Sequence, residues 1–365
     1  MDLSTDVLVV GARVAGASLA AQLADAGLRV LLVDRASFPS PTLSTHFFRG
    51  GDAATVFKQL GVLDTLLASG SPPLRKEYWY LGGNAMYKRV EPKSSGEVGY
   101  SLSVRRETLD HVLVSRAASS TNVTLMEKTR VTGWNWENGR VIGALLDTND
   151  RTLSIRSQLI VGADGRFSVV GKQVNPIVET SAPPHRALFY CYVTEFESPT
   201  GGPLDGPELS VFGDEIAYVF PSDGGTTCIA LSINLSEYPR ARSNREQYFT
   251  ERIGAHPGIA ERFAAAKKTG NLIGTACDPN YVRVPYGPGW ALLGDAGMHQ
   301  DPWSGRGIDM AAVHSTALAE AITSWMNGAD SEESAMRSYH QRRNETGLEL
   351  YWNTVRVAPD TSQLY

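Results

Sequence analysis

The chain has 365 residues, 42% of them hydrophobic and 20% charged, which excludes a wholly disordered or fibrous protein and allows one large or two joined domains. Its 34 basic and 39 acidic residues give a net charge of −5, which argues against nucleic acid or an anionic membrane bound through bulk charge, and no apolar run approaches the roughly 20 residues that span a bilayer. Three cysteines far apart in sequence, Cys191, Cys228 and Cys277, predict neither a disulfide framework nor a metal site, so we expect a cytoplasmic protein.

The N-terminal segment predicts a βαβ unit rather than a signal peptide. Residues 6–10 are a short apolar, β-branched run that is typical of a strand buried on both faces. A glycine turn at Gly11 leads into an Ala- and Leu-rich helix over residues 14–25, which Gly27 ends. A second apolar strand over residues 29–33 follows, so the two strands are expected to lie in a parallel sheet.

The rest of the chain changes character twice. After a predicted loop at 38–51, we expect helices over 52–68 and 106–118, then strands over 123–165 with Asn138-Gly139 as a hairpin turn. Alternating stretches from about 185 to 235 predict an antiparallel sheet. A charged helical stretch is expected at 243–268, strands at 281–284 and 290–293, and helix from 305 to the C-terminus. This order predicts an α/β fold with an antiparallel sheet inserted into it.

The first glycine-rich motif, Gly11-Ala-Arg-Val-Ala-Gly16, lies between the first strand and the first helix. A helix N-terminus at this place offers unpaired N–H groups and a positive dipole to a pyrophosphate, and Asp34 can accept a hydrogen bond from a ribose. Arg13 replaces the middle glycine of the dinucleotide-binding pattern, and its guanidinium could pair with phosphate or lie along the surface. Alone, the motif also fits an ordinary glycine turn.

Two further motifs follow in order. Residues 162–168 read Gly-Ala-Asp-Gly-Arg-Phe-Ser, and residues 293–309 contain Gly-Asp and then Pro-x-x-Gly-x-Gly. With the first motif, they resemble those of flavoprotein monooxygenases of the para-hydroxybenzoate hydroxylase type and their relatives, the halogenases and geranylgeranyl reductases. The resemblance covers essentially the whole chain, and it implies a non-covalently bound FAD with NAD(P)H as reductant.

The resemblance also implies a division into domains. We expect a Rossmann-like FAD-binding domain, an inserted antiparallel β-sheet domain for the substrate, and C-terminal helices, as in para-hydroxybenzoate hydroxylase. The expected boundaries are 1–70, 100–175 and 275–330 for the FAD-binding domain, 71–99 and 176–274 for the substrate-binding domain, and 331–365 for the helical segment.

Carried over by the resemblance, Arg106 would reach the FAD phosphate and ribityl region, Asp295 the ribityl chain, and the main chain of Val131 the adenine. A helix that begins near Gly307 would direct free N–H groups at the N1–C2=O edge of the flavin, where negative charge develops on reduction. The residues expected at the cofactor are Gly11, Arg13, Ala15, Gly16, Asp34, Arg35, Arg49, Arg106, Val131, Asp164, Gly165, Gly294, Asp295, Pro302, Gly305, Gly307 and Ile308.

Candidate residues for the substrate side come from two segments, the loop after the second strand and the inserted sheet. His46 could hydrogen-bond substrate or act as acid or base, or could only fix the geometry of its loop. Strand alternation places aromatic side chains on shared faces, which suits a flat apolar substrate but is also common in plain cores. The expected catalytic residues are His46 and Tyr192, and the expected substrate contacts are Phe48, Tyr190, Tyr218, Phe220 and Trp303.

The resemblance implies an FAD-dependent monooxygenase of secondary metabolism that oxygenates an aromatic or polyketide-like small molecule through a flavin C4a-hydroperoxide formed from O2. Halogenases of this group carry Trp-x-Trp-x-Ile-Pro where this chain has Ala217-Tyr-Val-Phe-Pro221, so halogenation is disfavoured. The alternatives are a flavin-dependent ene reductase or dehydrogenase on the same fold, and a non-catalytic flavin- or metabolite-binding protein. A monomer and a homodimer are both compatible with the sequence, and no metal site is expected.

Overall fold

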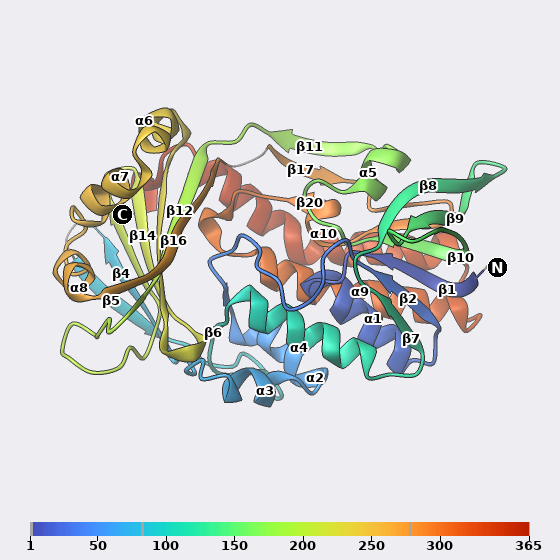
Figure 1. Ribbon diagram of the computed structural model, residues 1–365, viewed down its shortest axis with the longest axis horizontal. Helices are drawn as coiled ribbons and strands as arrows, with labels where there is room; N and C mark the ends of the chain where they lie inside the picture. The colour runs from blue at the N-terminus through green and yellow to red at the C-terminus, as the bar shows by residue number, and fades with distance from the viewer. Residues whose placement is uncertain (1–2, 82–83, 277–278, 365) are drawn as a thin grey trace.

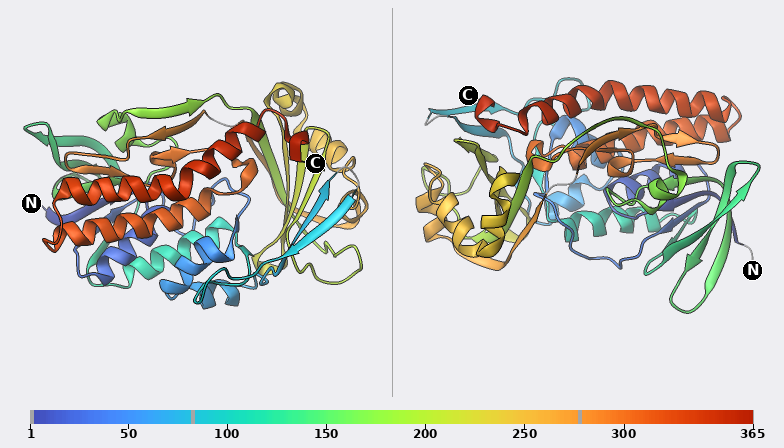
Figure 2. Two further views of the ribbon diagram at one scale, coloured as in Figure 1. Left: turned by 180° about the vertical axis from the view of Figure 1, so that it is seen from behind. Right: turned by 90° about the horizontal axis from the view of Figure 1, so that it is seen from above.

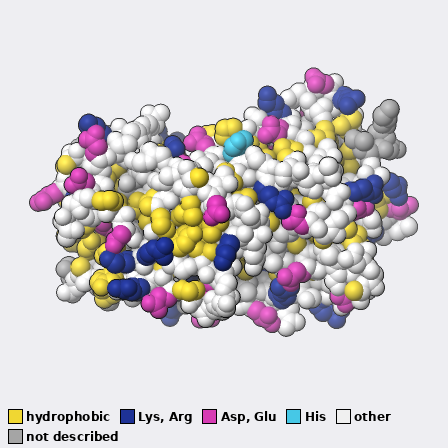
Figure 3. Space-filling model, turned by 90° about the horizontal axis from the view of Figure 1, so that it is seen from below, with side chains coloured by type: hydrophobic (Ala, Val, Ile, Leu, Met, Phe, Trp, Pro, Cys, Tyr) yellow, Lys and Arg dark blue, Asp and Glu magenta, His cyan; other side chains and the backbone are white. Residues whose placement is uncertain are grey.

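Two large β-sheets stand side by side in the computed structural model (Figure 1), which describes residues 3–81, 84–276 and 279–364 and therefore not Cys277. Within the described residues, no helix combines the length and apolar character needed to cross a membrane. On the face seen in Figure 3, acidic and basic side chains are interspersed rather than segregated.

The first sheet assembles segments that are far apart in the sequence. Its main strand order is β18–β19–β10–β1–β2–β7, and β1 pairs in parallel with both β2 and β10, which confirms the predicted βαβ unit. An antiparallel pair, β8 and β9, continues from β10. The strands are β1 (Leu3–Val10), β2 (Val30–Val33), β7 (Val123–Met126), β8 (Arg130–Glu137), β9 (Arg140–Asp147), β10 (Thr152–Gly162), β18 (Tyr286–Gly287) and β19 (Trp290–Leu292).

Helices cover one face of this sheet, and the β8–β9 pair covers the other. Val7 and Val9 of β1 pack against the helices, whereas Leu8 and Val10 pack with β9 and with α5 (Val169–Val174). This alternation is what a strand buried on both faces requires. The covering helices, with α9 and α10 lying side by side in Figures 1 and 2, are α1 (Val14–Asp25), α4 (Arg106–Ala118), α9 (Gly307–Met326) and α10 (Glu332–Val357).

The second sheet has seven strands in the order β16–β12–β15–β14–β13–β4–β5 and is antiparallel except where β13 meets β4. Three short helices cover its outer face: α6 (Tyr238–Ser243), α7 (Arg245–Ile253) and α8 (Ala260–Ala265) (Figure 1). The strands are β4 (Lys76–Leu81), β5 (Asn84–Arg89), β12 (Arg186–Thr194), β13 (Glu208–Phe212), β14 (Glu215–Pro221), β15 (Thr227–Asn234) and β16 (Lys267–Ala276). The mixed α/β fold with an inserted, largely antiparallel sheet is thus confirmed.

Several element boundaries differ from the sequence prediction. The loop predicted at 38–51 contains β3 (Phe47–Phe48), which pairs with β6 (Leu102–Ser103), and the start of a π-helical turn, η1 (Gly50–Ala54). The helix predicted at 52–68 is divided into α2 (Thr55–Gln59) and α3 (Leu63–Ala68) because Gly61, at φ +72°, turns the chain into the left-handed region. A small sheet that was not expected as a unit joins β11 (Val178–Ala182), β17 (Asn280–Arg283) and β20 (Met298–His299).

Candidate active site

The three glycine-rich motifs touch one another at the carboxyl ends of the parallel strands. A Cβ on Gly11, which has φ +101°, would lie 2.5 Å from the carbonyl oxygen of Ala163, so the first motif packs directly on the second. A Cβ on Gly294 would lie 3.3 Å from the Cβ of Ala15, so the third motif packs on the first helix. A Cβ on Gly16 would stand 1.8 Å from the Gly11 carbonyl oxygen, which makes glycine obligatory there.

The carboxylate of Asp34 holds the backbone of the dinucleotide loop, residues 11–16, in place. It accepts hydrogen bonds from the backbone N–H of Ala12 and of Ala36, both at 2.8 Å, and Gly11 N–H donates to the Val33 carbonyl. The expected bond from Asp34 to a ribose remains a prediction. Arg35 beside it is exposed, and Val131 on β8 packs against the core of the first sheet.

The side chain of Arg13 is mostly buried and is held by other residues of the protein. Its guanidinium pairs with the buried Asp110 on α4, and Arg106 pairs with the same carboxylate. Asp110 was not expected at the site, because its partner Arg13 is 97 residues away in sequence and no local pattern joins them.

The second motif is held by Asp164, whose carboxylate accepts from the Val169 N–H at 2.6 Å and so caps α5. In the third motif, the side chain of Asp295 is half-buried, and its carboxylate stands 3.5 Å from His299 Nδ1. The backbone carbonyl of Asp295 accepts from the Tyr281 hydroxyl at 2.7 Å, which fixes the turn at Gly294.

Arg49 fastens the loop that the resemblance assigns to the flavin ring. Its backbone N–H and Nη1 donate to the Asp309 carboxylate at 2.8 and 2.7 Å, and Nη1 and Nη2 also donate to the carbonyls of Gly305 and Ser304. Burial raises the pKa of Asp309, and the neighbouring Arg49 opposes that shift. Arg49 therefore joins the segment before η1 to the start of α9, which begins at Gly307 as predicted.

The residues of this loop fit a flat cofactor with polar edges. Apart from adjoining residues of the chain, no described protein atom lies within 4 Å of the position that a Cβ would take on Gly305 or Gly307. Gly305 has φ +61°, a conformation that also favours glycine. Among the described residues, Ser304 Oγ and both side-chain amide atoms of Gln300 are buried without a protein hydrogen-bond partner. With the free N–H groups at the start of α9, these atoms suit the donors and acceptors of a flavin.

All but one of the residues expected at the substrate lie together on the inner face of the seven-stranded sheet, the exception being Phe48. Tyr218 and Phe220 stack with ring centroids 5.6 Å apart, and the Tyr218 hydroxyl donates to the carbonyl of Trp303 at 2.7 Å. The aromatic cluster consists of Phe47, Tyr190, Tyr192, Tyr218, Phe220 and Trp303.

Phe47, which was not expected there, stacks on Phe220 at 5.1 Å. Phe48 lies instead in the core of the first sheet, edge-on to Phe57 at 5.2 Å. The alternation along β3 sends the two neighbours to opposite sides. Had residues 47–48 been recognised as a strand, the same rule would have separated them in advance.

His46 adjoins this cluster and is fully buried. Its Nε2 shares a hydrogen bond with the Tyr192 hydroxyl, and its ring also meets Tyr190 edge-on at 5.7 Å. Its Nδ1 has no protein partner among the described residues. Burial, reinforced by the positive charges of Arg106 and Arg105, lowers the pKa of His46 to about 3, so the imidazole is neutral at physiological pH. Its φ of +69° is unusual for a residue with a Cβ and marks a strained position.

A buried ion pair connects the two sheets beside His46. Asp223, in the turn after β14, accepts from the backbone N–H of Arg105 at 2.7 Å, from its guanidinium at 3.1–3.2 Å and from Thr108 Oγ1 at 2.7 Å. Arg105 immediately precedes α4, so this pair positions the seven-stranded sheet against the helix that carries Arg106. The ion pair between Arg105 and Asp223 was not expected from the sequence.

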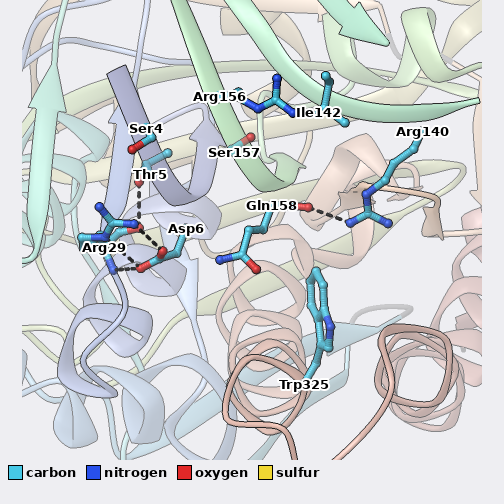
Figure 4. A pocket seen from close by; sticks show the side chains of 10 residues that line it. All are labelled: Ser4, Thr5, Asp6, Arg29, Arg140, Ile142, Arg156, Ser157, Gln158 and Trp325. Carbon is cyan, nitrogen blue, oxygen red and sulfur yellow. Dashed lines mark hydrogen bonds and ion pairs between the residues drawn. The ribbon is translucent and has the colours of Figure 1, made fainter. Parts of the chain in front are cut away.

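A separate hollow of about 430 Å³ lies near the amino-terminal ends of β1 and β2 (Figure 4). Its charged side chains already have partners: Arg29 pairs with Asp6 at 2.8 Å, Arg140 pairs with Glu332, and Arg156 pairs with Glu137 at 3.6 Å. It lies away from the strand ends where the three motifs meet, and we do not assign the reaction to it.

Comparison with known proteins agrees with this geometry. The model of a family described as FAD binding domain matches residues 4–354. A digeranylgeranylglycerophospholipid reductase of Methanosarcina acetivorans is 28% identical over 356 residues, which cover 93% of this chain and 81% of that protein. A tryptophan 2-halogenase of Chondromyces crocatus is 24% identical over 359 residues, covering 93% of this chain and 65% of that protein.

Two solved structures share the fold. The myxobacterial chondrochloren halogenase CndH superposes with a TM-score of 0.86 at 21% identity, over 96% of this chain and 81% of its own. PqsL of Pseudomonas aeruginosa in complex with 2-aminobenzoylacetate superposes with a TM-score of 0.83 at 21% identity, over 97% of this chain and 96% of its own. The chain therefore belongs to the FAD-binding domain family of flavoprotein oxidoreductases.

Proposed function

We propose that the protein is an FAD-dependent monooxygenase that uses NAD(P)H and O2 to oxygenate a flat, uncharged, aromatic or polyketide-like molecule. The observation that carries this proposal is the aromatic cluster on the inner face of the seven-stranded sheet, whose Tyr192 is hydrogen-bonded to the buried His46. Every side chain of the cluster is uncharged, so the rings themselves offer a charged substrate no counter-charge.

The aromatic cluster would bind and orient the substrate. Phe47 and Phe220 form a stacked apolar pair that can lie against a planar ring and exclude water. The hydroxyl of Tyr218 is held by Trp303, which keeps the ring in one orientation. Orientation and water exclusion are the contributions that an oxygenation needs from the protein.

Bound FAD would supply the redox chemistry, namely acceptance of hydride and activation of O2. We place it at the N-termini of α1 and α9, with Asp295, Gly305 and Gly307 along its ribityl chain and ring. The N–H groups of the first turn of α9 are fixed donors that stabilise negative charge without reorganisation.

The His46–Tyr192 pair would hold or move a proton at the substrate. When the Tyr192 hydroxyl donates to Nε2, the His46 Nδ1 carries the ring proton and can donate it. In the other tautomer, Nε2 donates to Tyr192 and Nδ1 accepts. Nδ1, which has no partner among the described residues, can therefore donate to or accept from a substrate hydroxyl, and burial keeps His46 neutral at neutral pH.

The test is oxygen labelling with a panel of phenolic and polyketide compounds. A compound that is turned over should stimulate both NAD(P)H oxidation and O2 uptake, and mass spectrometry should find oxygen from ¹⁸O2 in the product. Turnover to a product without label would overturn the proposal.

A pair of tyrosine variants then tests the site itself. Tyr192→Phe should lower kcat about 100-fold while FAD stays bound, since general acid–base catalysis contributes on that order. Tyr248→Phe is the matched control, because this buried phenol lies on α7 on the opposite face of the sheet. Equal effects of the two changes would contradict the role of Tyr192.

The second candidate is a flavin-dependent reductase acting on a carbon–carbon double bond. It is favoured by the 28% identity to the reductase of Methanosarcina acetivorans. A reductase would convert its substrate under strictly anaerobic conditions with chemically reduced flavin, and the product would gain two hydrogens and no oxygen. That outcome would replace the monooxygenase proposal.

A further inference from the structure

We propose that Arg13 is a tether that fastens residues 38–41 and helix α4 across the dinucleotide site and thereby slows the release of FAD. The proposal rests on FAD binding at the N-terminus of α1 and not on the oxygenation proposed above. Arg13 acts through other residues, so it is a positioning residue.

The contacts of Arg13 all reach across from the phosphate-binding loop to two other segments. Nη1 donates to Asp110 Oδ2 at 2.5 Å and to the Ser40 carbonyl at 3.3 Å. Nη2 donates to Ser40 Oγ at 3.1 Å and to the Pro41 carbonyl at 3.2 Å, and the guanidinium lies 5.4 Å from the ring centroid of Phe38. A fork of five N–H donors suits this task, because one planar group can serve several acceptors at once.

Residues 38–41 depend on Arg13 for their position. Within the part of the chain that the structure describes, the hydrogen bonds to Ser40 and Pro41 all come from its guanidinium. The nearest other anchor is the Phe38 N–H, which donates to Glu127 Oε1 at 2.9 Å. This segment follows β2 and Asp34, so it leaves the sheet at the carboxyl ends, where the dinucleotide loop lies. Without the tether, residues 39–41 would be held only through Phe38, which bonds to Glu127 and packs against the core of the first sheet, so we expect them to move more freely away from the site.

The charges also favour a diphosphate. Asp110 is fully buried and receives two guanidinium groups, Arg13 at one oxygen and Arg106 at the other at 2.9 Å. Two positive charges on one carboxylate leave one positive charge uncompensated. This charge adds to the positive end of α1 and would attract the pyrophosphate of FAD.

The same arrangement makes the tether testable without unfolding the protein. When Arg13 is removed, Asp110 keeps its bond to Arg106, so no buried carboxylate is left unpaired. Arg116→Ala is a matched control: Arg116 on α4 pairs with Asp25 on α1 at 2.6 Å, and thus joins the far ends of the same two helices.

The experiment measures the rate of FAD release from the holoprotein by flavin fluorescence after dilution, with the thermal unfolding of each apoprotein as the folding control. Arg13→Ala should release FAD about ten-fold faster or more, since charge-assisted hydrogen bonds of this kind are lost. Arg116→Ala should stay within about two-fold of wild type. Arg13→Lys should fall between wild type and Arg13→Ala, because an ammonium group keeps the charge but cannot reach both Asp110 and residues 40–41.

Three results would overturn the proposal. An unchanged release rate in Arg13→Ala would show that the contacts do not retain the cofactor. Equal acceleration in Arg116→Ala would assign the effect to loosened packing of α1 on α4. Slower release in Arg13→Gly than in wild type would show that the arginine obstructs the site instead of closing it. Each result concerns FAD retention only, so none depends on which substrate the enzyme oxidises.

Discussion

Replacing Arg49 by alanine should leave the buried carboxylate of Asp309 without its main ion-pair partner. Asp309 is 3% exposed, and after the change its closest cation is Arg306, whose Nη1 stands 3.9 Å from Oδ2. Removing one partner of a buried ion pair typically costs about 3–5 kcal/mol. At about 2.1 cal/mol/K per residue, 365 residues give an unfolding entropy near 0.8 kcal/mol/K, so Tm should fall by about 4–7 °C.

The stability that Arg49→Ala loses should depend on pH in one direction. Burial raises the pKa of Asp309, and Arg49 opposes this, so removing Arg49 lets the carboxyl bind a proton more readily when folded than when unfolded. The folded variant then holds more protons, and its deficit relative to wild type should shrink as pH falls from 8 to 5. Thermal unfolding of the holoprotein across that range measures it.

The control is a double variant that also removes the negative charge of Asp309. In Arg49→Ala/Asp309→Asn the buried group is a neutral amide of nearly the same shape, so most of the lost stability at pH 8 should return. A double variant no more stable than Arg49→Ala, or an Arg49→Ala protein as stable as wild type, would refute this account of how the loop before η1 is joined to α9.

Three further predictions address the cofactor and the buried histidines. Asp295→Ala should weaken FAD binding about ten-fold or more, measured by dialysis and flavin content; full occupancy would show that Asp295 does not meet the cofactor. Gly305→Val should shift the visible spectrum of bound flavin and slow its reduction by dithionite, because φ +61° is strained for valine and its side chain would enter the ring site; an unaltered spectrum would remove this loop from the flavin. Burial lowers the pKa of His46, His256 and His314 to about 3, 4 and 3, respectively. Below the ordinary pKa of 6.5, the unfolded chain therefore binds more protons than the folded protein. The free energy of unfolding should then fall by at most about 1.4 kcal/mol per pH unit for each histidine as the pH is lowered. His314→Gln should make the fall in Tm between pH 7 and pH 5 shallower, and an unchanged slope would contradict the buried neutral state.

Local patterns predicted the elements around the cofactor well. The bounds of α1 and α4 match the predicted helices, because helix propensity, glycines and apolar spacing act within one or two turns. The glycine at position 16 is also explained locally, since a side chain there would collide with the Gly11 carbonyl, and the local reason at Gly11 is its φ of +101°. The convergence of the three motifs required the family resemblance, because contact between Gly11 and Ala163 joins distant segments.

Contacts between distant segments account for most of what the sequence did not predict. Arg13 meets Asp110, and Arg49 meets Asp309, across 97 and 260 residues of chain. Exposed arginines and carboxylates are abundant, so no spacing distinguishes the pairs that become buried. The charged helical pattern predicted at 243–268 likewise runs past the start of β16 at Lys267, because charged residues are tolerated on helices and on edge strands alike.

We expect the choice between the proposed oxygenation and reduction to depend on the seven-stranded sheet more than on the cofactor loop. Along β12 and β14, alternate side chains lie either in the core under α7 or in the aromatic cluster. A shift of either strand by one residue would therefore exchange the two sets of side chains and change which of them can contact a substrate. Tyr218 also bonds to Trp303, in the loop assigned to the flavin ring. A substrate that moves Tyr218 therefore acts directly on the loop that carries Ser304 and Gly305. In this way, occupancy of the aromatic face can adjust the environment of the ring without any contact between the substrate and the N-terminus of α9.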